Sequence, residues 1–188
     1  MTSVAKRFAT YEDIVALPSN VVGEIVDGDL LVSPRPAGPH TLAASALGIE
    51  LGAPFLKGSG GPGGWWIIDE PELHLGSDVL VPDIAGWLRS EFPSLPSDHR
   101  FMQAPRWLCE VLSPSTARYD RFRKLNAYLR HGVQCAWIVD PLEQTLEVFR
   151  REEGGWLRTD TFEGSVQVRA YPFDAVEIDL STLWLPKP

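Results

Sequence analysis

Two acidic residues occupy positions in apolar runs where a buried strand ordinarily has none. Asp83 ends the run Val-Leu-Val-Pro-Asp at residues 79–83, and Glu110 lies in the middle of Leu-Cys-Glu-Val-Leu at residues 108–112. An ionised carboxylate among branched apolar side chains costs several kcal/mol unless it is paired, hydrogen-bonded or bound to a cation. A divalent metal ion would compensate both carboxylates, so we expect Asp83 and Glu110 to be metal ligands.

Lys124 follows on the next predicted helix and completes an Asp, Glu, Lys set that can hydrolyse phosphodiesters with a divalent ion. Carboxylate oxygens favour Mg²⁺ or Mn²⁺, and the four histidines and two cysteines show no spacing suited to zinc. In such a site Lys124 would orient the attacking water or stabilise the charge that develops on phosphorus.

Each of these residues also has a purely structural interpretation. Asp83 could cap a turn at a strand end, Glu110 could form a buried ion pair with Lys124 or Arg118, and Lys124 could be an ordinary surface lysine. Isolated histidines such as His40 and His74 are more often structural than catalytic, so the sequence assigns them no role.

Length and composition indicate one α/β domain over residues 1–188. A chain of 188 residues buries roughly 70% of its unfolded surface, and 44% hydrophobic residues with seven Trp and eight Phe argue against disorder. No apolar run approaches the roughly 20 residues that cross a bilayer, and the N-terminus lacks the apolar region of a signal peptide. We therefore expect a cytoplasmic protein without a membrane partner, whose Cys109 and Cys135 are free thiols in apolar strands.

The net charge of −8 weighs against strong non-specific binding to nucleic acid at physiological salt. The segment 118–131 differs, because it carries four Arg and one Lys against a single Asp. This basic segment could hold a phosphate backbone beside the proposed metal site, or it could be a solvated helix face.

Hydrophobic periodicity and turn residues predict the elements that position these side chains. A hairpin is expected at residues 23–32, because Asp27-Gly28 suits a type I′ turn. Glycine-rich residues 58–64 and proline-rich residues 92–105 are predicted to be loops. The other expected elements are helices at 11–17, 41–51 and 118–130, strands at 65–68, 73–75 and 79–87 that form a meander, strands at 107–112 and 135–139, a hairpin of 145–149 and 156–162, and short strands to 178.

The helix at 118–130 is expected to bring Lys124 back over the strand that holds Glu110. Phe122, Leu125 and Leu129 form its apolar stripe, and Lys124 lies on the adjacent stripe, where its long side chain can face the sheet edge.

The order of several motifs resembles a large bacterial family described as "putative restriction endonuclease", within the PD-(D/E)xK nuclease superfamily. The most specific segment is Glu-Val-Leu-Ser-Pro-Ser-Thr at residues 110–116. The remaining matches are Glu24, Val81-Pro82-Asp83, Asp120, Lys124-Leu125, Tyr128, Gly132-Val133 and Trp137-Ile138-Val139-Asp140-Pro141.

The resemblance implies a restriction-endonuclease-like core, which is a mixed central β-sheet flanked by helices, here with additional β-hairpins. It also implies that Asp83 and Glu110 are metal ligands and that Glu24 is a further acid of the site. Leu112 departs from the superfamily pattern, because a lysine usually stands two residues after the glutamate. In the resembling family this lysine is supplied by the following helix, at the position of Lys124.

Three functions remain open on this basis. The first is a Mg²⁺-dependent endonuclease with DNA as its substrate, and the second is a non-catalytic nuclease-like module for binding or assembly. The third is a hydrolase of a small phosphoester. A homodimer is a further expectation, because many nucleases pair to cut both strands and the tryptophans near the C-terminus, including Trp156 and Trp184, offer apolar surface.

Overall fold

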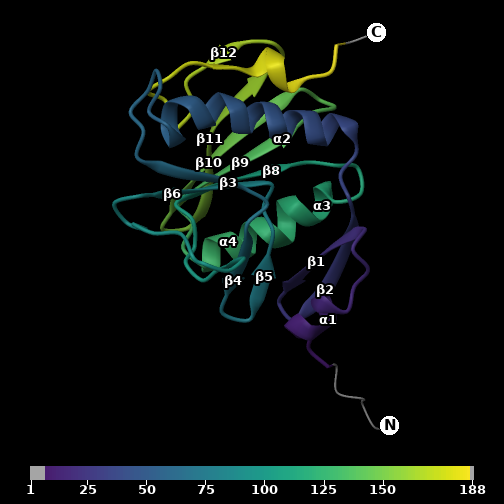
Figure 1. Ribbon diagram of the computed structural model, residues 1–188. Helices are drawn as coiled ribbons and strands as arrows, with labels where there is room; N and C mark the ends of the chain where they lie inside the picture. Colours follow the sequence, from purple (N-terminus) through teal and green to yellow (C-terminus); the bar gives the residue numbers. More distant parts are fainter. Residues whose placement is uncertain (1–6, 187–188) are drawn as a thin grey trace.

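A six-stranded mixed sheet forms the centre of the protein. The structure is a computed structural model that describes residues 7–186 (Figure 1). Neighbouring strands pair antiparallel except β8 and β9, which are parallel. In spatial order the strands are β11 (Gly155–Glu163), β10 (Thr145–Glu152), β9 (Cys135–Asp140), β8 (Trp107–Val111), β6 (Ile84–Leu88) and β3 (Trp65–Asp69).

A second, five-stranded sheet lies beside the first and contributes one of the candidate acids. Its strands in spatial order are β2 (Asp29–Pro34), β1 (Val21–Val26), β5 (Asp78–Leu80), β4 (Glu72–Leu75) and β7 (Arg100–Phe101). A short pair, β12 (Gln167–Val168) with β13 (Ile178–Asp179), completes the strands.

Helices cover both faces of the six-stranded sheet (Figure 1). Helix α2 packs on one face with the C-terminal segment, and the helical segment 117–130 packs on the other. The helices are α1 (Tyr11–Val15), α2 (Gly38–Leu51) with a following π-helical turn (Gly52–Leu56), α3 (Ala117–Tyr119), a π-helical turn (Asp120–Lys124), α4 (Leu125–Arg130) and a final 3₁₀ turn (Leu180–Leu183). This arrangement confirms the predicted restriction-endonuclease-like fold class. None of the helices within residues 7–186 has the length and apolar character needed to span a membrane.

Strand β8 is buried on both faces, which explains its almost continuous apolar sequence. Alternation along the strand turns Trp107, Cys109 and Val111 toward the core under α2. Leu108 belongs to the opposite core, which it shares with α4. Glu110, two residues further on, therefore also faces the helical segment that carries Lys124.

The chain passes from one sheet to the other at residues 81–83. We expected one strand over residues 79–87 and a meander, and both predictions are wrong. Strand β5 pairs with β4 in the five-stranded sheet, whereas β6 pairs with β3 in the six-stranded sheet. Pro82 lacks the N–H that a continuous ladder would require, so the strand breaks there and Asp83 lies at the junction.

Several predicted elements are confirmed with small shifts. The β1–β2 hairpin turns at Asp27 and Gly28, whose positive φ angles of 55° and 77° fit a type I′ turn. Helix α2 begins three residues earlier than predicted, because a proline is tolerated in the first turn of a helix. The predicted loop 92–105 contains the short strand β7, and Cys109 and Cys135 are buried free thiols as expected.

Two predictions about exposed and buried aromatic residues are wrong. Phe122 is 65% exposed rather than packed inward, because the polar stripe with Asp120, Lys124 and Tyr128 is the buried one. Trp184 is buried and donates to the carbonyl of Gly164, and Trp156 Nε1 donates to the carbonyl of Leu125. These tryptophans pack within the chain instead of forming a free apolar surface.

Candidate active site

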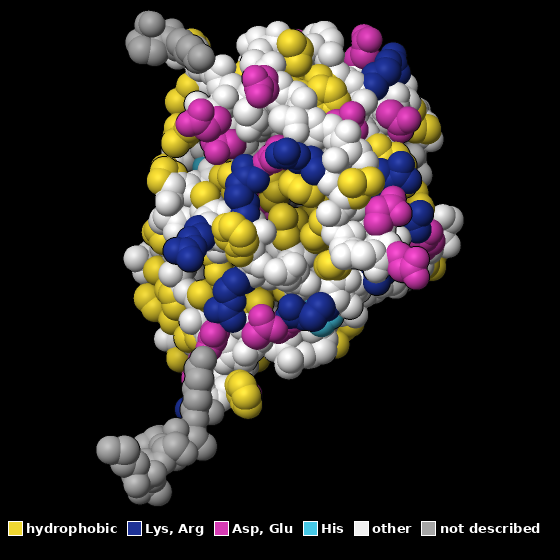
Figure 2. All heavy atoms as spheres, turned by 180° about the vertical axis from the view of Figure 1, so that it is seen from behind, with side chains coloured by type: hydrophobic (Ala, Val, Ile, Leu, Met, Phe, Trp, Pro, Cys, Tyr) yellow, Lys and Arg dark blue, Asp and Glu magenta, His cyan; other side chains and the backbone are white. Residues whose placement is uncertain are grey.

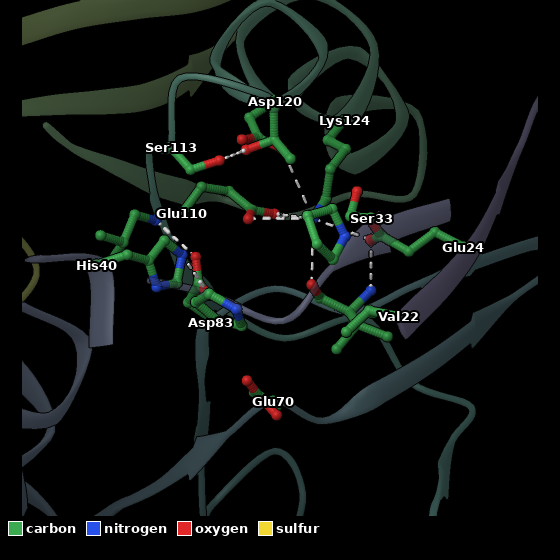
Figure 3. A pocket seen from close by; sticks show the side chains of 15 residues that line it. Val22, Glu24, Ser33, His40, Glu70, Asp83, Glu110, Ser113, Asp120 and Lys124 are labelled. Carbon is green, nitrogen blue, oxygen red and sulfur yellow. Dashed lines mark hydrogen bonds and ion pairs between the residues drawn. The ribbon is translucent and has the colours of Figure 1, made fainter. Parts of the chain in front are cut away.

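The ammonium of Lys124 connects the two sheets at the centre of a pocket (Figure 3). Nζ lies 2.9 Å from Oε1 of Glu110 on β8 and 2.9 Å from Oε1 of Glu24 on β1. It also donates to the carbonyl of Val81 at 3.1 Å, at the junction between the sheets. Lys124 is 3% exposed, and Glu110 and Glu24 are 2% and 7% exposed, so all three charges lie away from bulk water.

Asp83 lies beside this cluster and is held by hydrogen bonds on both of its oxygens. Oδ2 accepts from the backbone N–H of Val111 at 2.7 Å, and Oδ1 lies 3.1 Å from Nε2 of His40 in the first turn of α2. Figure 3 shows the His40 ring and Asp83 side by side, while Glu70 lies apart at the rim of the pocket. The structure thus brings Asp83, Glu110, Lys124 and Glu24 to one pocket, together with His40.

Two further residues of the helical segment lie beside Glu110 and Lys124. Tyr128 donates from its hydroxyl to Oε1 of Glu110 at 2.5 Å, and it is completely buried. Asp120 lines the pocket one turn before Lys124, with Oδ1 3.9 Å from Nζ. The π-helical turn contains both Asp120 and Lys124, and such turns occur often at functional sites.

The pKa values follow from burial and from an excess of negative charge. Burial raises the pKa of Glu110 well above its ordinary value, against the effect of Lys124. Burial also raises the pKa of Asp120, to about 6. Burial acts to lower the pKa of Lys124, but Glu110 and Glu24 reverse this effect, so the pKa lies well above its ordinary value and the ammonium stays charged.

The same competition determines the charge of His40. Burial of the ring acts to lower its pKa, whereas the hydrogen bond that the ring donates to Asp83 and the negative charge of Asp83 raise it, and the net result is a raised pKa. Nδ1 of His40 is buried and has no hydrogen-bond partner among residues 7–186.

The donor set of the pocket suits a hard divalent cation. Carboxylates of Glu24, Glu70, Asp83, Glu110 and Asp120 line it, against one ammonium, so negative charge is in surplus. Within residues 7–186, no three His, Cys, Asp or Glu side chains are arranged as a ready-made metal site. Lys124 occupies oxygens of Glu110 and Glu24 instead, so binding of a cation would require a rearrangement of the Lys124 side chain.

Sequence reasoning assigned no chemical role to His40, Asp120 or Tyr128. His40 and Asp83 are 43 residues apart, and nothing in the sequence indicates that α2 crosses the junction between the sheets. The sequence spacing could have indicated that Asp120 and Tyr128 lie next to Lys124, because each is four residues from it on one helix face.

His74, the other histidine noted in the sequence, lies outside this pocket. Its Nε2 is 2.6 Å from Oε1 of Glu72, and the same carboxylate oxygen accepts a hydrogen bond from the hydroxyl of Tyr11. His99 completes this group of side chains, with Nε2 2.9 Å from the Tyr11 hydroxyl.

The basic segment 118–131 is largely neutralised by carboxylates from other elements. Arg121 pairs with Glu147, Arg123 with Asp29, and Arg130 with Asp27 and Asp78. Figure 2 shows Lys and Arg side chains next to acidic and apolar ones on the face opposite to that of Figure 1. The local charge surplus read from the sequence is therefore not a uniformly basic surface.

Comparison with solved structures supports the class of fold. The crystal structure of a putative nuclease belonging to DUF820 from Anabaena variabilis ATCC 29413 is similar to this structure, with a TM-score of 0.74 and 24% sequence identity. The match covers 93% of this chain and 97% of the other. A comparison with curated proteins gives no match.

The family follows from the sequence of nearly the whole described chain. The chain belongs to the Uma2 family, whose description is "Putative restriction endonuclease", with a match over residues 8–181. This confirms the family resemblance inferred from the segment around Glu110.

Proposed function

We propose that this protein is a metal-dependent DNA endonuclease whose catalytic residues are Asp83, Glu110, Lys124 and Glu24. Membership of the Uma2 family supports a nuclease function. The observation that carries the proposal is the contact of the buried Lys124 ammonium with Glu110 and Glu24, beside Asp83, in an acidic pocket.

Asp83 and Glu110 would hold Mg²⁺ or Mn²⁺, and Glu24 would complete or tune the set of oxygen ligands. When bound, the cation would polarise the phosphoryl oxygen and lower the pKa of a water molecule. Lys124 has three donor hydrogens, and exchange of one protein contact would let it orient that water or stabilise negative charge on the phosphate.

The charge of the pocket predicts the order of binding. Five carboxyl groups line the pocket against one ammonium and the His40 ring, so a surplus of negative charge would repel the phosphodiester anion of DNA without added positive charge. We therefore expect DNA to enter the pocket after the divalent cation, not before it.

The test is cleavage of supercoiled plasmid and of single-stranded DNA with Mg²⁺, with Mn²⁺ and with EDTA. Asp83→Asn retains an acceptor for the Val111 N–H but loses the charge, and we expect cleavage to fall by more than about 100-fold. Asp160→Asn is a matched control, because it makes the same change at an exposed position of β11 that does not line the pocket. Equal activity of Asp83→Asn and the unaltered protein would refute the assignment.

A non-catalytic nuclease-like module is a second candidate, favoured by the way Lys124 occupies oxygens of Glu24 and Glu110. Binding of Mn²⁺ and DNA without cleavage would support this function. Hydrolysis of bis-p-nitrophenyl phosphate without DNA cleavage would instead support a hydrolase of small phosphoesters.

A further inference from the structure

A hollow of about 430 Å³ lies on the helical segment next to the candidate active site. Its lining consists of Ser115, Arg118, Tyr119, Phe122 and Arg123. The volume falls within the range of about 300–1,000 Å³ that is typical of ligand sites. The active-site pocket is lined by Ser113 and Thr116, which precede the helical segment, and by Asp120 and Lys124 within it. The two cavities therefore lie on neighbouring faces of one helical segment, which has a diameter of about 10–12 Å with its side chains.

The hollow combines two aromatic rings with two guanidinium groups. Phe122 is 65% exposed, and the guanidinium of Arg123 lies 5.8 Å from the centre of the Tyr119 ring. The guanidinium of Arg123 is held in place, because it donates hydrogen bonds to the carboxylate of Asp29 and to the carbonyl of Val26. Arg123 and Tyr119 therefore form a positioned wall of the hollow, while the Phe122 ring presents its surface to solvent.

Arg118 supplies positive charge at the same place. It is exposed and forms no ion pair within residues 7–186, in contrast to Arg121, Arg123 and Arg130. An unpaired guanidinium beside an exposed aromatic ring suits a nucleotide, because the ring stacks on the base and the guanidinium binds a phosphate.

Tyr119 links this hollow to the active-site pocket. Its ring lines the hollow, whereas its hydroxyl is buried and has no hydrogen-bond partner among the described residues. Burial and the negative charge of Glu24 raise the pKa of that hydroxyl, and Lys124 opposes them. The hydroxyl end of Tyr119 is thus within electrostatic reach of two residues of the candidate active site.

We propose that the hollow formed by Arg118, Tyr119, Phe122 and Arg123 binds an unstacked base of a DNA strand, near the phosphate held at the neighbouring pocket. This inference rests on the proposed nuclease function. It deepens that function by specifying the substrate as single-stranded or locally unpaired DNA, since a base inside a continuous duplex cannot stack on Phe122.

The test measures binding in Mg²⁺ to an oligonucleotide with phosphorothioate linkages, which resist hydrolysis, so its result does not depend on cleavage. A fluorescently labelled single-stranded oligonucleotide is titrated with the unaltered protein and with Phe122→Ala, Phe122→Trp and Leu142→Ala. Leu142 is a matched control, because it is also an exposed apolar residue, at 59%, but lies away from the hollow. We expect Phe122→Ala to weaken binding about 5- to 100-fold, and we expect Phe122→Trp and Leu142→Ala to bind within about twofold of the unaltered protein.

Photocrosslinking locates the base independently. An oligonucleotide that contains 5-iodouracil should form adducts at Tyr119 or Phe122, and adducts should be absent when the same strand is in a continuous duplex. Unchanged binding by Phe122→Ala would overturn the proposal. A change of oligomeric state in Phe122→Ala with unchanged DNA binding would also overturn it, because the hollow would then be an interface between copies of the chain. DNA cleavage without a Phe122 effect would leave the nuclease function intact and remove only this inference.

Discussion

The ammonium of Lys124 spans both oxygens of Glu110, at 2.9 Å from Oε1 and 3.1 Å from Oε2. These residues lie on a helical turn and on a central strand, and both side chains are almost completely buried. A buried pair of this kind is sensitive to loss of one partner, because the other charge is then left without compensation.

We expect Lys124→Met to lower the free energy of unfolding by about 3–5 kcal/mol in urea denaturation at pH 7.5. The double variant Lys124→Met/Glu110→Gln should be less destabilised than the sum of its single variants, because it removes both charges. Lys57→Met is the control, since Lys57 is an exposed lysine and its replacement should change stability by less than about 0.5 kcal/mol. Additive effects in the double variant would mean that the pair contributes no coupling energy.

Asp120 is expected to make the stability depend on pH. Its pKa is raised by burial from 3.8 to about 6, so between about pH 6 and pH 4 the folded protein binds this proton and the unfolded chain does not. Lowering the pH from about 6 to 4 therefore increases the contribution of Asp120 to the free energy of unfolding. Above pH 6 the ionised Asp120 carboxylate destabilises the folded state.

It follows that Asp120→Asn should raise the free energy of unfolding by about 1–3 kcal/mol at pH 7.5. The gain should shrink at pH 4.5, and Asp160→Asn, at an exposed position of β11, should show no such difference. Urea denaturation at both pH values measures the effect. A variant that is equally destabilised at both values would show that ionised Asp120 supports Lys124 instead.

His40 is expected to position Asp83. Nε2 of His40 lies 3.1 Å from Oδ1 of Asp83, and this oxygen would lose its side-chain partner in His40→Ala. Loss of such a supporting contact typically lowers metal affinity about 10- to 100-fold, and we expect this change for Mn²⁺ in isothermal titration calorimetry. His40→Asn can still donate to Asp83 and should recover part of the affinity, whereas equal affinity of all three proteins would contradict this role.

Local sequence patterns predicted the parts of the fold that depend on neighbouring residues. The turn at Asp27-Gly28, the helix that ends before Gly132 and the buried acid in β8 each have a local cause. The break at Pro82 was not predicted, although proline within an apolar run is a local signal against a continuous strand. The pairing of β6 with β3 could not be predicted from the sequence, because it depends on which of the two sheets the chain enters after Pro82.

The candidate site shows the same division between local and long-range information. The acids Asp83 and Glu110 stand out because each interrupts an apolar run. The exposure of Phe122 could not be predicted from the helix pattern, because the buried stripe is polar and owes its burial to carboxylates on other elements. Glu24 contacts Lys124 only after two segments 100 residues apart have met, and that contact has no local signature.

The attachment of the β1–β2 hairpin has a consequence for how the pocket is completed. Six residue pairs join β1 to β2, but a single pair, Ile25 with Val79, joins β1 to β5 in the ladder. Glu24 is thus carried by an element with strong internal pairing and few backbone bonds to its neighbour. Detachment of the hairpin as one cooperative unit would withdraw Glu24 from Lys124 while Asp83 and Glu110 keep their strands. Docking of the hairpin, which Arg123 and Arg130 also hold through Asp29 and Asp27, would then complete the acidic pocket, and a ligand that requires Glu24 would protect the amides of residues 21–34 from hydrogen exchange.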